Sequence, residues 1–407
     1  MATLQCDICG GKIVVQAGGG VGECANCGAS YSLERMREIV SGIKVSQTGS
    51  AEDVEQWRAL LDRYYSAGDF SEAEKIVKKI LEALPSDRDA GQKYEELQTL
   101  KYMDARNGVL LKYSGQAEEV VIPSCVRSIA DRAFEGCENL QSVTIPDSVT
   151  AIGDCVFLHC RSLKSATIPN CMTRIPIGTF GGCASLQSVT IPEGVTRIEN
   201  SAFSGCHSLQ SVTFPNSVTS IERNVFFECR SLQSVTIPDG VTRIEDATFR
   251  GCSSLQSVTI PDSVTSIEAE AFMGCSSLRS VTIPKGVTKI AKEAFFGCSS
   301  LQSVTIPAGV AWIDESAFWA CSSLRSVTIP DSVTRMGPDA FAHCDNLSQV
   351  VIPRNAYYSE IELENIFKYT EWLRNRWKQQ GRCRNCGGAF KGVLAPVCRQ
   401  CHKRKDY

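Results

Sequence analysis

Apolar and polar residues follow one repeated pattern from about residue 120 to residue 353, with a period of about 23 residues. The clearest landmark is an apolar residue followed by proline, found at Ile145-Pro146, Ile168-Pro169, Ile191-Pro192, Phe214-Pro215, Ile237-Pro238, Ile260-Pro261, Ile283-Pro284, Ile306-Pro307, Ile329-Pro330 and Ile352-Pro353. One such unit has too little apolar surface to bury by itself, so neighbouring units must stack and share one core. The pattern therefore predicts a solenoid.

Each copy contains two extended segments. In the segment 140–145, apolar residues alternate with the outward-facing Ser142 and Thr144, which predicts a half-buried strand. Pro146 has no N–H to donate to a strand ladder, so the strand ends there. A second extended segment is expected at 149–152, with its apolar residues in the same core.

A phenylalanine followed three residues later by a cysteine closes each copy through a tight turn. The repeated cysteines are Cys137, Cys160, Cys183, Cys206, Cys229, Cys252, Cys275, Cys298, Cys321 and Cys344. A free cysteine packs as a small apolar residue, so we expect a buried ladder. The outward Ser and Thr residues have two interpretations, namely residues that suit a pleated surface or a surface that binds an ordered lattice or a glycan.

The residue directly after each phenylalanine differs from copy to copy. The large apolar side chains there include Phe227, Met273, Phe296 and Trp319. Elsewhere in the repeat, Trp312 replaces a residue that is Arg or Ser in most copies. Exposed apolar residues that line up across stacked units often form a partner-binding site. We therefore predict that these five residues bind a protein partner. The alternative is that they pack under the neighbouring turn.

The amino-acid sequence of a full copy, as in 271–290, closely resembles the BspA-like class of leucine-rich repeats. This resemblance extends over about 110–355. The resemblance implies a right-handed leucine-rich repeat solenoid with one long parallel sheet, and ligand binding as its usual role. Proteins of this class are often found on cell surfaces. The N-terminal residues 1–6 lack the basic flank and apolar segment of a signal peptide, so the expected location is the cytoplasm and an adhesin-like role is an alternative.

Two cysteine pairs near the N-terminus predict a structural zinc site. The expected ligands are Cys6, Cys9, Cys24 and Cys27. Two pairs of the form Cys-x2-Cys complete a tetrahedral Zn²⁺ shell without an open position for water. A disulfide pair and an iron–sulfur site are the alternatives. Together with a following helix, this zinc ribbon is expected to occupy residues 1–45.

A second zinc ribbon is predicted at residues 381–407. Its expected ligands are Cys383, Cys386, Cys398 and Cys401. Basic residues surround it, namely Arg374, Arg376, Lys378, Arg382, Arg384, Lys403, Arg404 and Lys405. A basic patch of this kind contacts phosphates in nucleic-acid-binding proteins, so nucleic-acid binding is the alternative function; a solubilising surface is the simpler explanation.

Helical periodicity appears on both sides of the repeats. The spacing of Trp57, Leu60 and Tyr64, and then of Phe70 and Ala73, predicts a helical hairpin with a third helix over residues 52–106. This pattern resembles a single tetratricopeptide repeat, which implies an interaction element or a spacer. The solenoid is expected at 108–357 and a capping helix at 358–380.

The complete prediction is an α/β-repeat solenoid flanked by two small zinc ribbons and a helical hairpin. A net charge of −3 over 407 residues argues against a polyanion binder as a whole. We find no phosphate loop, no zinc-protease motif and no Ser-His-Asp order that the repeat would bring together. We therefore expect a non-enzymatic scaffold or adaptor whose cofactors are two structural Zn²⁺ ions, with no membrane span, an unidentified protein partner and an unassigned oligomeric state.

Overall fold

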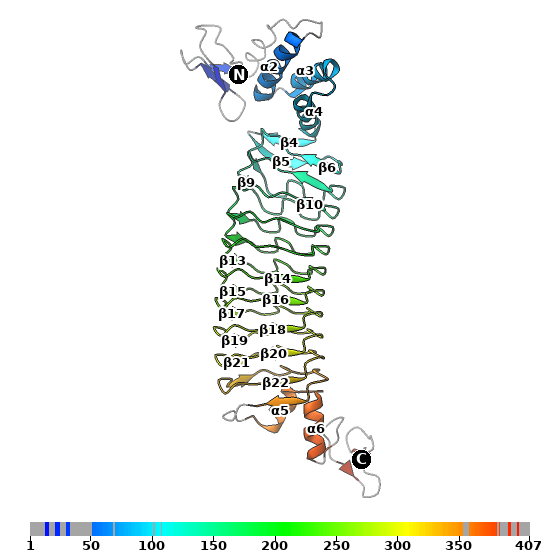
Figure 1. The fold of residues 1–407 in the computed structure, drawn as a ribbon, viewed down its shortest axis with the longest axis vertical. Coiled ribbons are helices and arrows are strands. Elements are labelled where there is room, and N and C mark those ends of the chain that lie inside the picture. Colours follow the sequence, from blue (N-terminus) through cyan, green and yellow to red (C-terminus); the bar gives the residue numbers. More distant parts are fainter. Residues whose placement is uncertain are drawn as a thin grey trace. The chain divides into compact units, whose positions relative to one another are not determined.

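The computed structural model describes residues 13–15, 21–24, 30–32, 51–67, 70–100, 102–106, 108–352, 358–380, 382, 390–391 and 397–398. The chain forms two compact units, Met1–Val156 and Phe157–Tyr407. Figure 1 shows the fold of both units, and each is described by itself.

The first unit begins with an antiparallel sheet and three helices. The sheet consists of β1 (Ile13–Val15), β2 (Val21–Cys24) and β3 (Ser30–Ser32). The helices are α2 (Ala51–Ala67), α3 (Phe70–Ala83) and α4 (Arg88–Leu100). The helices thus cover the segments whose apolar spacing predicted them, with Trp57, Leu60, Ile76 and Ile80 buried in one shared core. The likeness to a tetratricopeptide repeat remains a prediction.

The same unit contains the first turns of the solenoid. Its strands are β4 (Met103–Arg106), β5 (Val109–Tyr113), β6 (Glu119–Val121), β7 (Ser128–Ile129), β8 (Ser142–Thr144) and β9 (Ala151–Ile152). Strand β4 pairs antiparallel with β5, whereas β5–β7–β9 and β6–β8 are parallel. Cys125, in the loop after β6, packs against the helical core. The helices therefore cover the beginning of the solenoid and shield its first apolar layer.

The second unit consists of stacked coils held together by parallel strand pairs (Figure 1). The short strands of one face are β11 (Arg174–Ile175), β12 (Arg197–Ile198), β13 (Ser220–Ile221), β15 (Arg243–Ile244), β17 (Ser266–Ile267), β19 (Lys289–Ile290), β21 (Trp312–Ile313) and β23 (Arg335–Met336). The strands of the other face are β10 (Ser165–Ala166), β14 (Ser234–Thr236), β16 (Ser257–Thr259), β18 (Ser280–Thr282), β20 (Ser303–Thr305), β22 (Ser326–Thr328) and β24 (Gln349–Val351). Equivalent residues of successive copies lie side by side, as in the pairing of Ser234 with Ser257, which agrees with stacked repeats that share one core.

Stacked phenylalanine rings form the centre of this unit. From Phe157 to Phe367, neighbouring rings have centroids 5.1–5.6 Å apart and are nearly parallel. Burying each ring contributes about 1.5–3 kcal/mol, and an aromatic pair adds about 0.5–1.5 kcal/mol. The fixed period therefore has a direct energetic cause, since a shift of one residue in any copy would remove its ring from the stack.

The C-terminal cap contains two helices where the sequence predicted one. They are α5 (Glu360–Ile366) and α6 (Glu371–Gln379). The chain breaks between them because Tyr369 adopts a positive φ of 65° and the Thr370 hydroxyl accepts a hydrogen bond from the Leu373 N–H, which starts a new helix. Ile361, in the first turn of α5, is 71% exposed and does not take part in sealing the core.

The cap imitates the turn of one more coil. The N–H groups of Asp339, Phe341 and His343 donate to carbonyls of residues 365, 366 and 368. Phe367 meanwhile extends the ring stack, 5.3 Å from Phe341. The last coil therefore has partners for backbone groups that would otherwise be left unpaired. Farther along the chain, β25 (Phe390–Lys391) and β26 (Val397–Cys398) pair antiparallel.

Candidate functional site

Four aromatic side chains form a continuous row on successive coils of the second unit. The rings of Phe296 and Trp319 stack with centroids 4.3 Å apart and planes 9° apart. His343 lies 4.9 Å from Trp319, and Tyr369 lies 4.5 Å from His343. We call this row the aromatic ridge.

The ridge is partly open to solvent. Phe296, Trp319 and His343 are half-buried, and Tyr369 is 44% exposed. Since the stacked rings cover each other's faces, it is mainly their edges that remain accessible. Both predictions for this position thus have some basis, because each ring packs on the neighbouring coil and still presents apolar surface.

His343 and Tyr369 were not among the predicted site residues. Both occupy the position two residues after a core phenylalanine, and the backbone there has a positive φ, 59° at His343 and 65° at Tyr369. Five other coils of this unit place glycine at this position, namely Gly182, Gly205, Gly251, Gly274 and Gly297. Such a backbone costs a residue with a Cβ about 1–2 kcal/mol. An aromatic ring in place of the glycine was the signal in the sequence that could have revealed them.

Phe227 and Met273 occupy the same repeat position as Phe296, directly after a core phenylalanine, but lie outside the aromatic ridge. Arg250 separates them, and its guanidinium lies 5.5 Å from the centroid of the Phe227 ring. Both Phe227 and Met273 are half-buried. The predicted apolar stripe is therefore interrupted by a charge at Arg250. Beyond it the stripe resumes at Met273, and its aromatic part begins at Phe296.

Trp312 belongs to a different surface from the ridge. It lies on β21, where the Lys289 ammonium and the Arg335 guanidinium lie 4.1 and 4.5 Å from its ring centroid. Lys289 also pairs with Asp314 at 2.9 Å. Gly337 stands where the equivalent position of other coils has a carboxylate, and among the described residues Arg335 has no acidic partner. The sequence prediction grouped Trp312 with the stripe, whereas the structure places it between two cations.

The repeated cysteines from Cys160 to Cys344 form the predicted buried ladder, whereas Cys137 in the first unit is only half-buried. From Cys183 to Cys344, each Sγ donates to the carbonyl of the phenylalanine 26 residues earlier, at 3.1–3.3 Å. Burial raises the pKa of Cys183 and of Cys298 to about 12. These thiols are therefore protonated at neutral pH and have the character of core residues, not nucleophiles.

The predicted zinc ligands fall almost entirely outside the described residues. Only the backbone of Cys24, in β2, and of Cys398, in β26, is described. Within the parts of the chain that the structure describes, no group of three or more His, Cys, Asp or Glu side chains is placed to bind a metal. Both zinc ribbons therefore remain predictions.

Several basic residues of the nucleic-acid alternative are used inside the C-terminal cap. Arg376 pairs with Glu360 and Arg382 with Glu364. Arg374 donates to the Asp345 carbonyl at 3.1 Å, while Lys378 is exposed. Arg384, Lys403, Arg404 and Lys405 lie outside the described residues. The positive charge that the described part of the cap offers to phosphates is thus reduced.

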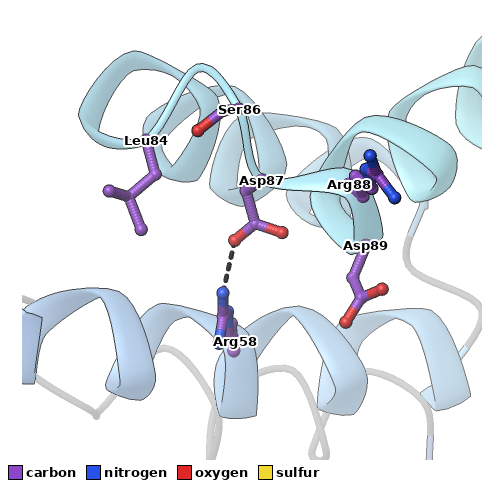
Figure 2. Close-up of a pocket in the computed structure, with 6 residues that line it drawn as sticks. All are labelled: Arg58, Leu84, Ser86, Asp87, Arg88 and Asp89. Carbon is purple, nitrogen blue, oxygen red and sulfur yellow. Dashed lines mark hydrogen bonds and ion pairs between the residues drawn. The ribbon is translucent and has the colours of Figure 1, made fainter.

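A small pocket in the first unit lies between α2 and the start of α4 (Figure 2). Its volume is about 250 Å³. Arg58 reaches Asp87 at 2.6 Å, and this contact holds the pKa of the Asp87 carboxyl below its usual value. The other oxygen of Asp87 accepts from the Ala90 N–H at 3.1 Å and so caps α4. The polar groups at the centre of the pocket are therefore committed to holding the helices together.

None of the described helices is both long enough and apolar enough to cross a membrane.

Solved structures of leucine-rich repeat proteins resemble this chain. A leucine-rich cell surface protein of Faecalibacterium prausnitzii is 31% identical over 60% of this chain and 72% of that chain, with a TM-score of 0.41. A leucine-rich repeat protein of Bacteroides ovatus is 27% identical over 61% of this chain and 84% of that chain, with a TM-score of 0.34. No curated protein sequence matches the chain.

The family comparison covers the repeats themselves. Residues 110–232, 173–280 and 265–375 match the BspA type leucine-rich repeat region, in six copies. These ranges include most of the solenoid and much of its C-terminal cap, and together they exceed half of the chain. The resemblance predicted from the repeat wording is thereby confirmed, and the chain belongs to the BspA-type leucine-rich repeat family.

Proposed function

We propose that the solenoid is a non-enzymatic scaffold or adaptor that binds a protein partner through the aromatic ridge. The observation that carries this proposal is the unbroken row of Phe296, Trp319, His343 and Tyr369, of which the last two occupy a strained backbone position. Strained residues that a fold retains are concentrated at functional sites. Family membership supports the general class of binding protein.

The physical properties of the ridge suit a protein interface. Aromatic residues are enriched among the few that dominate binding energy. Stacking between coils already fixes the rings, so little side-chain freedom is left to lose when a partner binds. Tyr, Trp and Phe are enriched in the buried centre of interfaces, whose rim is polar, and His343 and Tyr369 add polar atoms at the end of the ridge.

The test replaces Phe296 and Trp319 by serine in the full-length chain. Serine is the natural residue at the equivalent position in another coil, Ser204, so we expect the solenoid to remain folded. Partners are recovered from the native cell by affinity purification with quantitative mass spectrometry. We expect the specific partner to be lost from the double variant, and the loss to be reproduced with the purified partner.

A matched control is Trp312→Ser, which removes an indole from the other surface. Equivalent positions carry serine at Ser220 and Ser266, so this change is also compatible with the repeat. We expect the control to retain the partner. Equal recovery with wild type and the ridge variant would reject the proposal, and so would equal loss from the ridge variant and the control.

We also propose that the chain works in the cytoplasm. This is supported by the repeated cysteines from Cys183 to Cys344, which are thiols and form no disulfide. Cell fractionation tests the location, and recovery at the cell surface would favour the adhesin-like alternative.

A further inference from the structure

A polar groove lies at the C-terminal end of the second unit, away from the cysteine and phenylalanine core. Its volume is about 580 Å³. It is lined by Gln302, Ser323, Arg325, Ser326, Asn346, Ser348, Gln349 and Glu371. We call this the polar groove.

The strand ladder and the cap give the groove a fixed frame. Strands β22 and β24 pair in parallel with Ser326 opposite Gln349. On the other side, the Trp372 N–H donates to the Leu347 carbonyl at 2.7 Å, which fixes the start of α6 and hence Glu371. The ring of Trp372 also contacts Phe367, with centroids 4.9 Å apart. The lining backbone therefore has little freedom before a ligand arrives, and preorganisation reduces the cost of binding.

The lining side chains are all polar. They supply three hydroxyls, three amides, one guanidinium and one carboxylate. Among the described residues, neither Arg325 nor Glu371 has a side-chain hydrogen bond or ion pair. The equivalent position is glutamine at Gln256 and Gln302, so an arginine there, as at Arg325 and Arg279, departs from the commonest residue of the repeat.

This composition restricts the class of ligand. An apolar ligand finds no apolar side chain, whereas ordinary small-molecule pockets are lined mainly by such residues. A phosphate would meet the single guanidinium together with the carboxylate of Glu371, which opposes it. Neighbouring hydroxyls of a sugar suit this lining, because amides, carboxylates and guanidinium groups each engage two such groups at once.

We infer that the polar groove is a binding site for a neutral oligosaccharide. Exposed residues of the neighbouring strand β20, among them Ser303 and Thr305, continue the polar surface beyond the groove. A glycan longer than the groove would therefore meet further hydroxyls along the sheet. This site is separate from the ridge and does not depend on the proposed protein partner.

The experiment uses the full-length chain and four neutral probes, namely tetra-N-acetylchitotetraose, cellotetraose, mannotetraose and maltotetraose. Saturation-transfer NMR detects binding, and titration calorimetry measures the affinity of any probe that binds. We expect at least one probe to bind and Arg325→Gln to weaken it about tenfold, as for the loss of one charge-assisted hydrogen bond. Glu371→Gln is expected to have a similar effect.

The matched control is Arg279→Gln, the same substitution at the equivalent position two coils earlier. Arg279 is exposed and outside the groove, and glutamine is the usual residue at this position. We expect it to leave the affinity unchanged. Absence of binding to all four probes at millimolar concentration would overturn the inference, as would an equal loss in the Arg279 and Arg325 variants. Preference for a charged peptide over every saccharide would also overturn it.

The proposed protein site on the ridge and the proposed saccharide site in the polar groove can be tested independently of each other. The Phe296→Ser, Trp319→Ser double variant is expected to bind the saccharide as wild type does, while Arg325→Gln is expected to retain the protein partner. Loss of both ligands in either variant would contradict the assignment of two distinct surfaces.

Discussion

The backbone position that carries His343 and Tyr369 can be tested at a neighbouring coil whose residue at this position has no ring. Ala320 occupies the same position with φ of 55° and is half-buried. A left-handed backbone costs a residue with a Cβ about 1–2 kcal/mol, which glycine does not pay. Glycine in turn loses about 0.5–1 kcal/mol more backbone entropy on folding. The change Ala320→Gly is therefore expected to stabilise the fold by about 0.5–1 kcal/mol.

The reverse change at the preceding coil should have the opposite sign. A Cβ added at Gly297 would have its nearest heavy atom, the Gly274 Cα, at 3.8 Å, which is ordinary contact. The backbone, with φ of 71°, is then the main source of strain. Gly297→Ala is expected to destabilise the fold by about 0.5–1 kcal/mol.

Thermal and urea denaturation of the full-length chain measure both changes. For a unit of this size, 1 kcal/mol shifts Tm by about 2–4 °C, so we expect a rise of about 2 °C for Ala320→Gly and a similar fall for Gly297→Ala. Ala317→Gly, in the buried part of the same coil, is the control and is expected to lower Tm. If Ala320→Gly lowers Tm as Ala317→Gly does, the reasoning about this backbone position is wrong.

Four further results are expected. His343→Gly should raise Tm less than Ala320→Gly, because it also removes the ring contacts with the ridge, and it should weaken partner binding in the same pull-down. Phe272→Ala should cost about 3–5 kcal/mol in urea denaturation, since it opens a cavity in the ring stack. A thiol reagent at pH 8 should label the exposed Cys171 in the native protein but reach Cys183, whose pKa burial raises to about 12, only after unfolding, as peptide mapping will show. Elemental analysis should find two zinc ions per chain, and a Cys-to-Ser change in one ribbon should remove one of them.

The solenoid could be predicted because every copy meets the same packing problem. The recurrence of the Phe, Cys, Leu and Ile positions identified the core residue by residue, and their burial agrees, as at Phe249 and Cys252. The three-residue strands such as β14 and β16 were also foreseeable, since alternation after the Ser position marks them. A repeated pattern lets ten copies be compared within a single chain, which supplies information that the sequence of one isolated domain lacks.

The cap could not be predicted in the same way, because its contacts depend on tertiary docking. Phe367 follows Phe341 after 26 residues instead of the usual period, and no repeat wording surrounds it. Its place in the stack depends on the hydrogen bonds that residues 365, 366 and 368 accept from the last coil. The apolar spacing of 358–380 gave a helix but no information on the break at Tyr369.

Departures from a repeat carry more functional information when they cost stability than when they are neutral. His343 and Tyr369 occupy a position that glycine fills without strain, whereas the exposed Arg325 replaces glutamine without such a cost. These departures lie close to the cap, which supplies Tyr369 to the ridge and Glu371 to the polar groove within three residues of chain. A cap that only sealed the core would need Phe367 and the backbone carbonyls, but neither of those side chains. The cap is therefore best understood as part of both proposed binding surfaces. Tyr369 of the ridge and Glu371 of the polar groove follow closely after Phe367, which closes the core.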